Sequence, residues 1–385
     1  MILYSLLFTI LIIYISKIKR PELHSTNRYI KQLALSYIFP MIIMNSGVLQ
    51  SMFQHIPTCY ILCGTTKTII NLKIKEGVVV LVEKFENNLF EEPVSYTIKF
   101  LTAIYNFIYS VFGCFNVKAD VNKNVQKIEQ KDVNVIIMHG LGGSSSSKHV
   151  VGAANMFLKK KCRVFCVNAR GVKGTLKNDE FTHFGMTDDI KALTKHILCN
   201  YEGRIFYVGF SQGANICTKF MAEYKHERII GGVSVCNPFN FLKIEEMFLK
   251  QRGYIFTYAY RFLGKVFMDY INDSLKTKYK KADIRFILQD LIDNKRLKAE
   301  SVDAFMNENS SEFYINKIDV PYLFINADDD PVIPTAVIPR EKIFKNANTG
   351  LVTLQGGHLG FKSIFMTSTV EGIINEFFTN LNKNE

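Results

Sequence analysis

The nine residues VGFSQGANI, at positions 208–216, place Ser211 between two glycines. A Gly-x-Ser-x-Gly pattern that follows a β-branched apolar run and precedes a helical one is typical of a nucleophile elbow, a sharp turn that exposes the serine hydroxyl. Gly209 and Gly213 have no Cβ atom to clash where the strand and the helix almost touch. An ordinary glycine-rich turn also fits these residues. A catalytic role for Ser211 therefore depends on whether the rest of the chain contains a base, an acid and oxyanion donors.

The base is expected at His358. Where an elbow carries a catalytic serine, the acid and the histidine follow it in that order along the chain. Only His226 and His358 come after Ser211, and only His358 follows an acidic residue at a predicted strand end. It lies in LQGGHLGF, where two glycines allow a loop to bring the ring over the sheet.

The acid is expected in NADDDPVIP, at positions 326–334. Three consecutive aspartates repel one another, so each is expected in a different environment. We choose Asp330, because the Pro-Val that follows places it at the turn leaving the strand, and Asp329 is the alternative acid. A solvated acidic turn closed by Pro331 also fits this string taken alone.

An oxyanion hole needs backbone N–H groups, one from the residue after the serine and one from the loop after an earlier strand. These donors are expected at Gln212 and at Leu141, which lies in the glycine-rich MHGLGG. The following SSSS, at positions 144–147, is expected to cap the next helix rather than to supply nucleophiles. A phosphate-binding loop is not indicated, because no Gly-Lys-Ser/Thr ending is present.

Short apolar runs alternate with amphipathic ones from position 133 onward, which predicts a mostly parallel sheet covered by helices on both faces. The candidate residues follow strand ends, where such sheets place their chemistry. The predicted strands are 133–138, 163–168, 204–208, 229–235, 321–326 and 351–354. Between 237 and 320 the sequence is helical, aromatic and basic, which predicts a helical lid inserted after the sixth strand; a purely structural cap fits equally.

The composition indicates a folded chain with a large core, since 48% of its 385 residues are hydrophobic and 21% are charged. Its eight cysteines show no C-x-x-C pair, and the spacings Cys59/Cys63 and Cys162/Cys166 lack a nearby histidine pair. A reduced compartment and no metal site are therefore expected. The net charge of +12 is spread along the chain without a recognised nucleic-acid module, so no nucleic-acid partner is expected.

Residues 1–20 predict a single-pass membrane anchor. The uncharged MILYSLLFTILIIYIS is followed by Lys17, Lys19 and Arg20, and this arrangement differs from that of a signal peptide. The positive-inside rule predicts that the remaining chain, 21–385, lies in the cytosol. A membrane of the endoplasmic reticulum or lipid-droplet type is compatible with this orientation. Because the apolar stretch is short for an upright span, a shallow interfacial position is the alternative.

A second uncharged run, at 100–117, lies in an aromatic-rich insertion and linker at 87–131. It predicts either a buried helix or a segment that dips into the membrane near the substrate entrance.

These blocks together resemble the membrane-anchored α/β-hydrolase-domain lipases and acyltransferases. That group contains bacterial YheT-like hydrolases, yeast medium-chain fatty-acid ethyl ester synthase/esterases and mammalian monoacylglycerol- and phospholipid-cleaving members. The resemblance is carried by GFSQGANI, NADDDPVIP, GGHLGF, HGLGGSSSSKHV, VNARGVKGT, FGMTDDIKALTKHI and, upstream, NSGVLQSMF. Three departures from the family pattern are Val48, where histidine is usual, Ala214, where a second glycine is usual, and the aromatic-rich insertion at 87–131, which has no counterpart in the family pattern.

The resemblance implies an α/β-hydrolase fold with Ser211 as nucleophile, Asp330 as acid and His358 as base. It also implies ester or thioester chemistry on lipid-like acyl groups, without a cofactor or metal. The expected function is a serine esterase or lipase that cleaves carboxylic esters through an acyl-enzyme. Two alternatives stay open, which are a medium-chain acyl-CoA:alcohol O-acyltransferase and a non-catalytic lipid-binding protein of this fold.

Overall fold

The computed structural model describes residues 21–33, 65–75, 78–87, 133–172, 180–250, 254–361 and 368–383. Three predicted features lie outside these residues: the anchor at 1–20, the upstream element at 45–53 and the aromatic run at 100–117.

The core of the described residues is a nine-stranded sheet with the order β1-β9-β8-β7-β6-β4-β5-β3-β2. Strands β4 to β9 pair in parallel, as predicted, whereas β1, β2 and β3 pair antiparallel at the two edges. The strands are β1 (Glu22–Ser25), β2 (Thr65–Lys75), β3 (Val78–Asn87), β4 (Val133–Met138), β5 (Arg163–Val167), β6 (Arg204–Phe210), β7 (Ile229–Val235), β8 (Tyr322–Ala327) and β9 (Thr349–Leu354).

The three antiparallel strands were not predicted from the sequence. A signal was present in β2, where TTKTIINLKIK is rich in β-branched residues and alternates apolar with polar positions. Strand β3 pairs with β5 from Val82↔Val167 to Phe85↔Val164, which brings it beside the central parallel strands.

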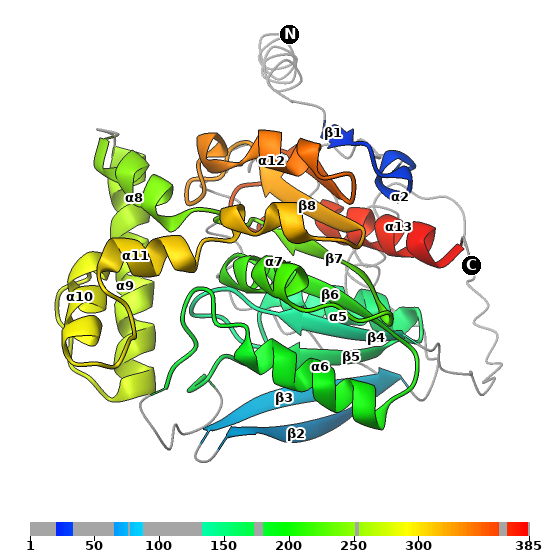
Figure 1. Ribbon diagram of the computed structural model, residues 1–385, viewed down its shortest axis with the longest axis horizontal. Helices are drawn as coiled ribbons and strands as arrows, with labels where there is room; N and C mark the ends of the chain where they lie inside the picture. The colour runs from blue at the N-terminus through cyan, green and yellow to red at the C-terminus, as the bar shows by residue number, and fades with distance from the viewer. Residues whose placement is uncertain are drawn as a thin grey trace, which may run out of the picture.

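Helices cover both faces of the sheet (Figure 1). The helices α5 and α13 pack on one face, and α6, α7 and α12 pack on the other. The helices are α2 (Arg28–Lys31), α5 (Lys148–Lys159), α6 (Asp188–Asn200), α7 (Gln212–Glu223), α8 (Phe241–Lys250), α9 (Tyr254–Leu275), α10 (Ile284–Asp293), α11 (Val302–Glu308), α12 (Arg340–Lys345) and α13 (Thr369–Lys383).

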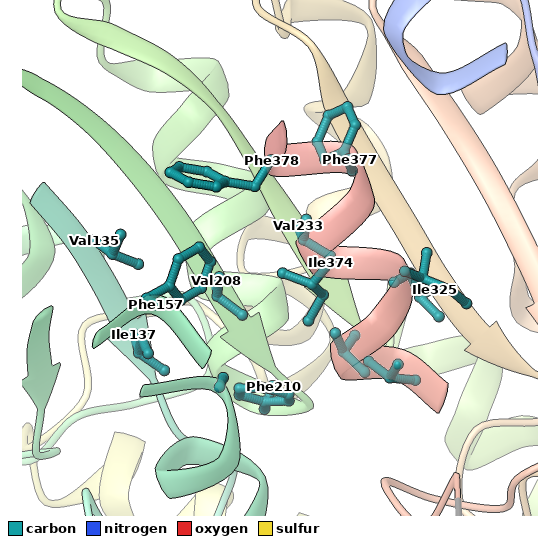
Figure 2. Packing of buried hydrophobic residues seen from close by; sticks show 14 of the residues in the cluster. Val135, Ile137, Phe157, Val208, Phe210, Val233, Ile325, Ile374, Phe377 and Phe378 are labelled. Atoms are coloured by element: carbon teal, nitrogen blue, oxygen red, sulfur yellow. The ribbon is translucent and has the colours of Figure 1, made fainter. Parts of the chain in front are cut away.

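Aromatic side chains join α5 and α13 to the sheet (Figure 2). The rings of Phe157 and Phe378 meet edge to face with their centroids 5.1 Å apart, and Phe378 also packs on Phe206 of β6 at 5.2 Å. Such pairs stabilise a core beyond the apolar area they bury. This face therefore holds β6, the strand that leads into Ser211, in a fixed position.

The helices α8 to α11 form the insertion between β7 and β8 and gather at one end of the molecule (Figure 1). No strand lies among the described residues of 237–320, as predicted. The insertion follows the predicted strand 229–235, which is the seventh strand in chain order rather than the sixth, because β1, β2 and β3 all precede the first predicted strand. Across the described ranges, no helix combines the length and the apolar character needed to cross a bilayer.

Candidate active site

Ser211 lies on a strained turn between β6 and α7. Its backbone has φ 53° and ψ −116°, a conformation that non-glycine residues rarely adopt. The turn is held because the Ser211 N–H donates to the Val235 carbonyl at 2.8 Å. A Cβ atom on Gly209 would lie 2.4 Å from the Gly213 carbonyl oxygen, and one on Gly213 would lie 2.5 Å from the His139 carbonyl oxygen. Both positions therefore require glycine.

The structure brings Ser211, His358 and Asp330 into one hydrogen-bonded chain. The Nε2 atom of His358 lies 2.9 Å from the Ser211 Oγ, and its Nδ1 atom lies 2.9 Å from the Asp330 Oδ2. Asp330 and His358 are buried, with 6% and 8% of their surface exposed. The geometry suits proton transfer from the serine hydroxyl to an imidazole that a carboxylate orients.

The two candidate aspartates have different partners. Asp330 also accepts hydrogen bonds from the N–H groups of Val332 and Ile333 through its Oδ1, at 2.8 and 2.9 Å. Asp329 instead accepts from the N–H groups of Gly356 and Gly357, both at 2.8 Å. Asp330 therefore contacts the His358 ring, whereas Asp329 holds the backbone of the loop that carries it.

That loop is tightly wound around His358. Gly357, Leu359 and Phe361 all have positive φ angles, between 44° and 61°. A Cβ atom on Gly356 would lie 2.2 Å from the Phe361 ring, so only glycine fits there. The strained loop and its Asp329 cap keep the imidazole directed at the serine.

The predicted oxyanion loop approaches the elbow closely. A Cβ atom on Gly140 would lie 2.9 Å from the Ser211 Cβ, and Gly142 has a positive φ of 68°. Leu141, Ser211 and Gln212 line the same cavity. The Gln212 residue also begins α7, whose N-terminal N–H groups favour negative charge at this point.

The serine run after this loop does not cap α5 through a side chain, in contrast to the prediction. Ser147 occupies the N-cap position without such a bond, and its Oγ accepts from the Ser144 N–H at 3.0 Å. Ser145 is buried, and its hydroxyl donates to the Glu83 Oε2 at 2.7 Å. Its N–H donates to the Asn168 Oδ1 at 2.9 Å. The run therefore ties the oxyanion loop to β3 and to the end of β5.

Glu83 contacts the serine run that follows the predicted oxyanion loop, and no prediction from the sequence included it. It lies on β3, is 4% exposed and receives the Lys67 Nζ at 2.9 Å in addition to the Ser145 hydroxyl. Glu83, one of two glutamates in VVVLVEKFEN, gives little signal, because its partner Ser145 is 62 positions away. Asn168, by contrast, belongs to a block that the sequence did single out.

Cys236 lies directly after β7, and its side chain is buried beside the acid. Its Sγ, one oxygen of Asp330 and one nitrogen of His358 lie within 4.8 Å of one another. Burial raises the pKa of the Cys236 thiol well above its ordinary value, and the neighbouring Asp330 carboxylate adds to this effect. Because metals bind the thiolate and Asp330 already bonds to His358, these residues fit a metal ion poorly.

A second buried polar cluster joins α9 to the main sheet. Arg170 is fully buried, and its Nε donates to both oxygens of Asp189, at 2.8 and 3.1 Å. Burial raises the pKa of Asp189, while its hydrogen bond to Arg170 acts in the opposite direction. The Tyr270 hydroxyl of α9 contacts the carbonyl oxygens of Arg170 and Thr182, at 3.3 and 3.1 Å.

An apolar cavity begins at Ser211 and extends beneath the inserted helices. It encloses about 710 Å³ of empty space, part of which is open to solvent. Its apolar lining side chains include Phe184, Phe241, Ile244, Phe248, Leu263 and Ile333. One charged side chain, Glu245, also lines it and pairs with Arg285, whose Nε lies 3.1 Å from the carboxylate.

Comparisons with known proteins agree with this fold. Residues 133–363 match the alpha/beta hydrolase fold family. The chain is 27% identical over 259 residues to "Abhydrolase domain-containing protein 2" of Drosophila melanogaster, covering 60% of this chain and 64% of that protein. It is 29% identical over 256 residues to "Monoacylglycerol lipase ABHD2" of Danio rerio, covering 60% and 58%.

Among solved structures, the esterase Pf2001 of Pyrococcus furiosus superposes with a TM-score of 0.50 at 14% identity. This superposition covers 91% of this chain and all of the esterase chain. At that identity the likeness concerns the fold alone. The aligned part of this chain spans about three fifths of the length of the two curated relatives above.

The family match extends over more than half of the chain. The chain therefore belongs to the α/β-hydrolase fold family.

Proposed function

We propose that this protein is a serine hydrolase that cleaves carboxylic esters of lipid-like substrates through an acyl-enzyme. The observation that carries this proposal is the hydrogen-bonded chain from Ser211 through His358 to Asp330, with 2.9 Å at each step. The strained backbone of Ser211 and the apolar cavity at its hydroxyl support it. Each of these features has a separate role in ester cleavage, and they converge on one point.

In the proposed mechanism His358 Nε2 removes the proton of Ser211 as Oγ attacks the ester carbonyl carbon. The tetrahedral oxyanion accepts hydrogen bonds from the N–H groups of Leu141 and Gln212. Asp330 stabilises the imidazolium, which then donates its proton to the departing alcohol oxygen as the C–O bond breaks. Water, deprotonated by His358, attacks the acyl-enzyme, and transfer of that proton back to Ser211 releases the carboxylic acid.

The cavity supports a long acyl chain as the part of the substrate that is recognised. Its lining is mainly aliphatic and aromatic, so burial of methylene groups there contributes about 0.8 kcal/mol each. The helices α8, α9 and α10 supply much of this lining, which gives them the role of a lid that excludes water. The name of the zebrafish relative, a monoacylglycerol lipase, agrees with a lipid ester as substrate.

We further propose that residues 1–20 attach the protein to a membrane, with residues 21–385 as one α/β-hydrolase domain and 237–320 as its lid. The support is the uncharged apolar stretch followed by Lys17, Lys19 and Arg20. Extraction of membranes at alkaline pH measures this attachment. The full chain is expected to stay in the membrane pellet, and a chain without residues 1–20 is expected to be released more readily.

The test of the activity is fatty-acid release from a panel of esters by detergent-solubilised protein. The panel extends from short p-nitrophenyl esters through monoacylglycerols to phospholipids, and each substrate is assayed with wild type and with Ser211→Ala. Release that depends on Ser211 supports the hydrolase. Absence of release together with absence of fluorophosphonate labelling would favour the non-catalytic lipid-binding alternative.

The same assay separates hydrolysis from acyl transfer. Ethanol or glycerol added to the reaction would capture the acyl group as a new ester if the protein were an acyltransferase. If free acid is the sole product at every alcohol concentration, the transferase alternative fails.

A further inference from the structure

The inserted helices expose large apolar side chains to solvent. Among the described residues, eight large hydrophobic side chains are exposed, and four of them lie on α8, α9 and α10. These four are Leu249 at 68%, Tyr258 at 59%, Phe262 at 37% and Phe286 at 51%. Exposed apolar residues on neighbouring helices indicate a surface that interacts with a membrane, a ligand or another protein.

On α9 the exposed residues form one stripe. Tyr258, Arg261, Phe262 and Lys265 follow a spacing of three and four, so they lie on the same side of the helix. The other sides of α9 contribute Tyr260 and Leu263 to the cavity and Phe267 to the core. The helix therefore faces the substrate cavity on one side and solvent, with aromatic and basic side chains, on the other.

Positive charge is concentrated beside this stripe. Between positions 254 and 286 the sequence has seven lysines and arginines against three aspartates. Lys276, Lys278 and Lys280 are exposed and form no ion pair within the described part of the chain. Lys281 pairs with Asp283 and also lies 5.6 Å above the Phe286 ring.

The lysine segment is packed against α9. The Asn272 side chain of α9 bonds to both backbone groups of Tyr279, at 2.8 and 2.9 Å. At Gly264, a Cβ atom would lie 2.3 Å from the Ala282 carbonyl oxygen, so the two segments touch through backbone. The lysines and the exposed aromatic residues therefore belong to one continuous region.

We propose that this region docks on an anionic lipid bilayer and thereby presents the substrate cavity to the membrane. We call it the aromatic-basic surface and define it by Tyr258, Phe262, Lys276, Lys278, Lys280 and Phe286. Aromatic side chains partition to the interface between headgroups and acyl chains, and unpaired lysines are attracted to anionic headgroups. This combination fits an anionic bilayer, because binding at a lipid interface uses apolar burial and electrostatic attraction to anionic headgroups together.

The consequence for catalysis rests on the proposed function. Helices α8, α9 and α10 line the cavity with Phe248, Tyr260 and Ile284, and their adjacent side chains would contact the bilayer. A lipid ester could then move from the bilayer to Ser211 without crossing bulk water.

The chain contains no tryptophan, which allows a direct test of docking that does not depend on activity or on the predicted anchor. A single tryptophan is introduced at Phe286 or Phe262 in the full chain, as Phe286→Trp or Phe262→Trp. Matched controls are Phe313→Trp and Phe344→Trp, because Phe313 is 50% and Phe344 38% exposed, close to the test positions, and both lie outside the aromatic-basic surface.

Fluorescence is recorded with phosphatidylcholine vesicles, with and without phosphatidylserine, and with brominated lipids as quenchers. In the presence of phosphatidylserine we expect a blue shift and quenching for Phe286→Trp and Phe262→Trp, and neither for the two controls. When Lys276, Lys278 and Lys280 are replaced by glutamine, we expect the lipid concentration needed for half of the fluorescence response to rise at least tenfold. Each lysine strengthens binding to an anionic surface by roughly fivefold. A matched triple change of Lys159, Lys191 and Lys195, which are exposed and lie outside the aromatic-basic surface, is expected to leave this lipid concentration unaltered.

Equal responses at test and control positions, or no response at any of them, would overturn the docking proposal. Hydrolysis of a soluble p-nitrophenyl ester is measured on the same variants. If that ester is not cleaved by wild type while the probe in the Phe286→Trp variant still inserts, the proposed function fails and docking stands. If the soluble ester is cleaved normally but no probe inserts, docking alone fails.

Discussion

The replacement Asp330→Asn tests the assignment of the acid most sharply. In the native site, two backbone N–H groups hold the Asp330 Oδ1, and the Oδ2 faces the His358 Nδ1. An asparagine has one acceptor and one donor at these positions. The N–H groups of Val332 and Ile333 require the acceptor, so the amide NH₂ must face His358. The Nδ1 atom then has to accept a hydrogen bond, which moves the ring proton to Nε2, opposite Ser211.

A histidine in that tautomer cannot remove the serine proton. The corresponding change in serine proteases lowers kcat about 10⁴-fold. This loss corresponds to about 5.5 kcal/mol of transition-state stabilisation. We expect an effect of this size, with little change in KM, because Asp330 does not line the substrate cavity.

The matched control is Asp329→Asn, one position earlier in the same acidic run. Asp329 bonds to Gly356 and Gly357 through its Oδ1 alone, and an asparagine oxygen can accept the same two bonds. We therefore expect kcat to change by no more than about threefold, as for substitutions that keep their contacts.

The assay is the initial rate with a p-nitrophenyl ester, together with the rate of fluorophosphonate labelling of Ser211. Circular dichroism verifies that each variant is folded. The reasoning is refuted if Asp329→Asn loses as much activity as Asp330→Asn, or if Asp330→Asn retains more than a tenth of the wild-type kcat.

Three further outcomes are expected. Glu83→Gln should lower kcat about tenfold at unchanged KM in steady-state kinetics, since a weaker tie to the oxyanion loop affects mainly the transition state; an unchanged kcat would leave Glu83 without a positioning role. Burial lowers the pKa of His183 from 6.5 to about 4, so the unfolded chain binds a proton that the folded chain excludes, and the free energy of unfolding should fall by about 3 kcal/mol between pH 6.5 and pH 4. The free energy of unfolding of His183→Phe, measured with urea, should lack this part of the pH dependence. If the variant and wild type show the same pH dependence, His183 is not its source. Arg170→Met should reduce the free energy of unfolding by about 3–5 kcal/mol by leaving Asp189 buried without its partner, and urea unfolding that shows a loss below about 1 kcal/mol would argue against a stabilising role for the pair.

The sequence predicted the six parallel strands of the sheet, because each of those strands is a local, nearly continuous apolar run. The antiparallel strands β1 to β3 were missed, although β2 alternates visibly, because the regular alternation of strands with helices is clear only from position 133 onward. The position of the elbow could also be predicted from the sequence, since the two glycines and the serine are close along the chain and the turn is a local structure.

Some features of the site could not be predicted from the sequence because they depend on contacts between distant segments. The serine run was predicted to cap α5, but Ser145 contacts Glu83 instead, a residue on the antiparallel strand β3 that had not been predicted. Cys236 had no assigned role, and its place beside Asp330 follows from the neighbouring positions of β7 and β8.

The sequence by itself determined the residue types and their order: a serine in an elbow, aspartates after a later strand and a histidine between glycines. Local patterning is enough for this, because turn and strand preferences act over a few residues. Only the tertiary structure decided which aspartate faces His358, and which side of α9 lines the cavity while the other stays exposed. These choices depend on the packing of segments that are far apart along the chain, whose relative positions no short stretch of sequence encodes.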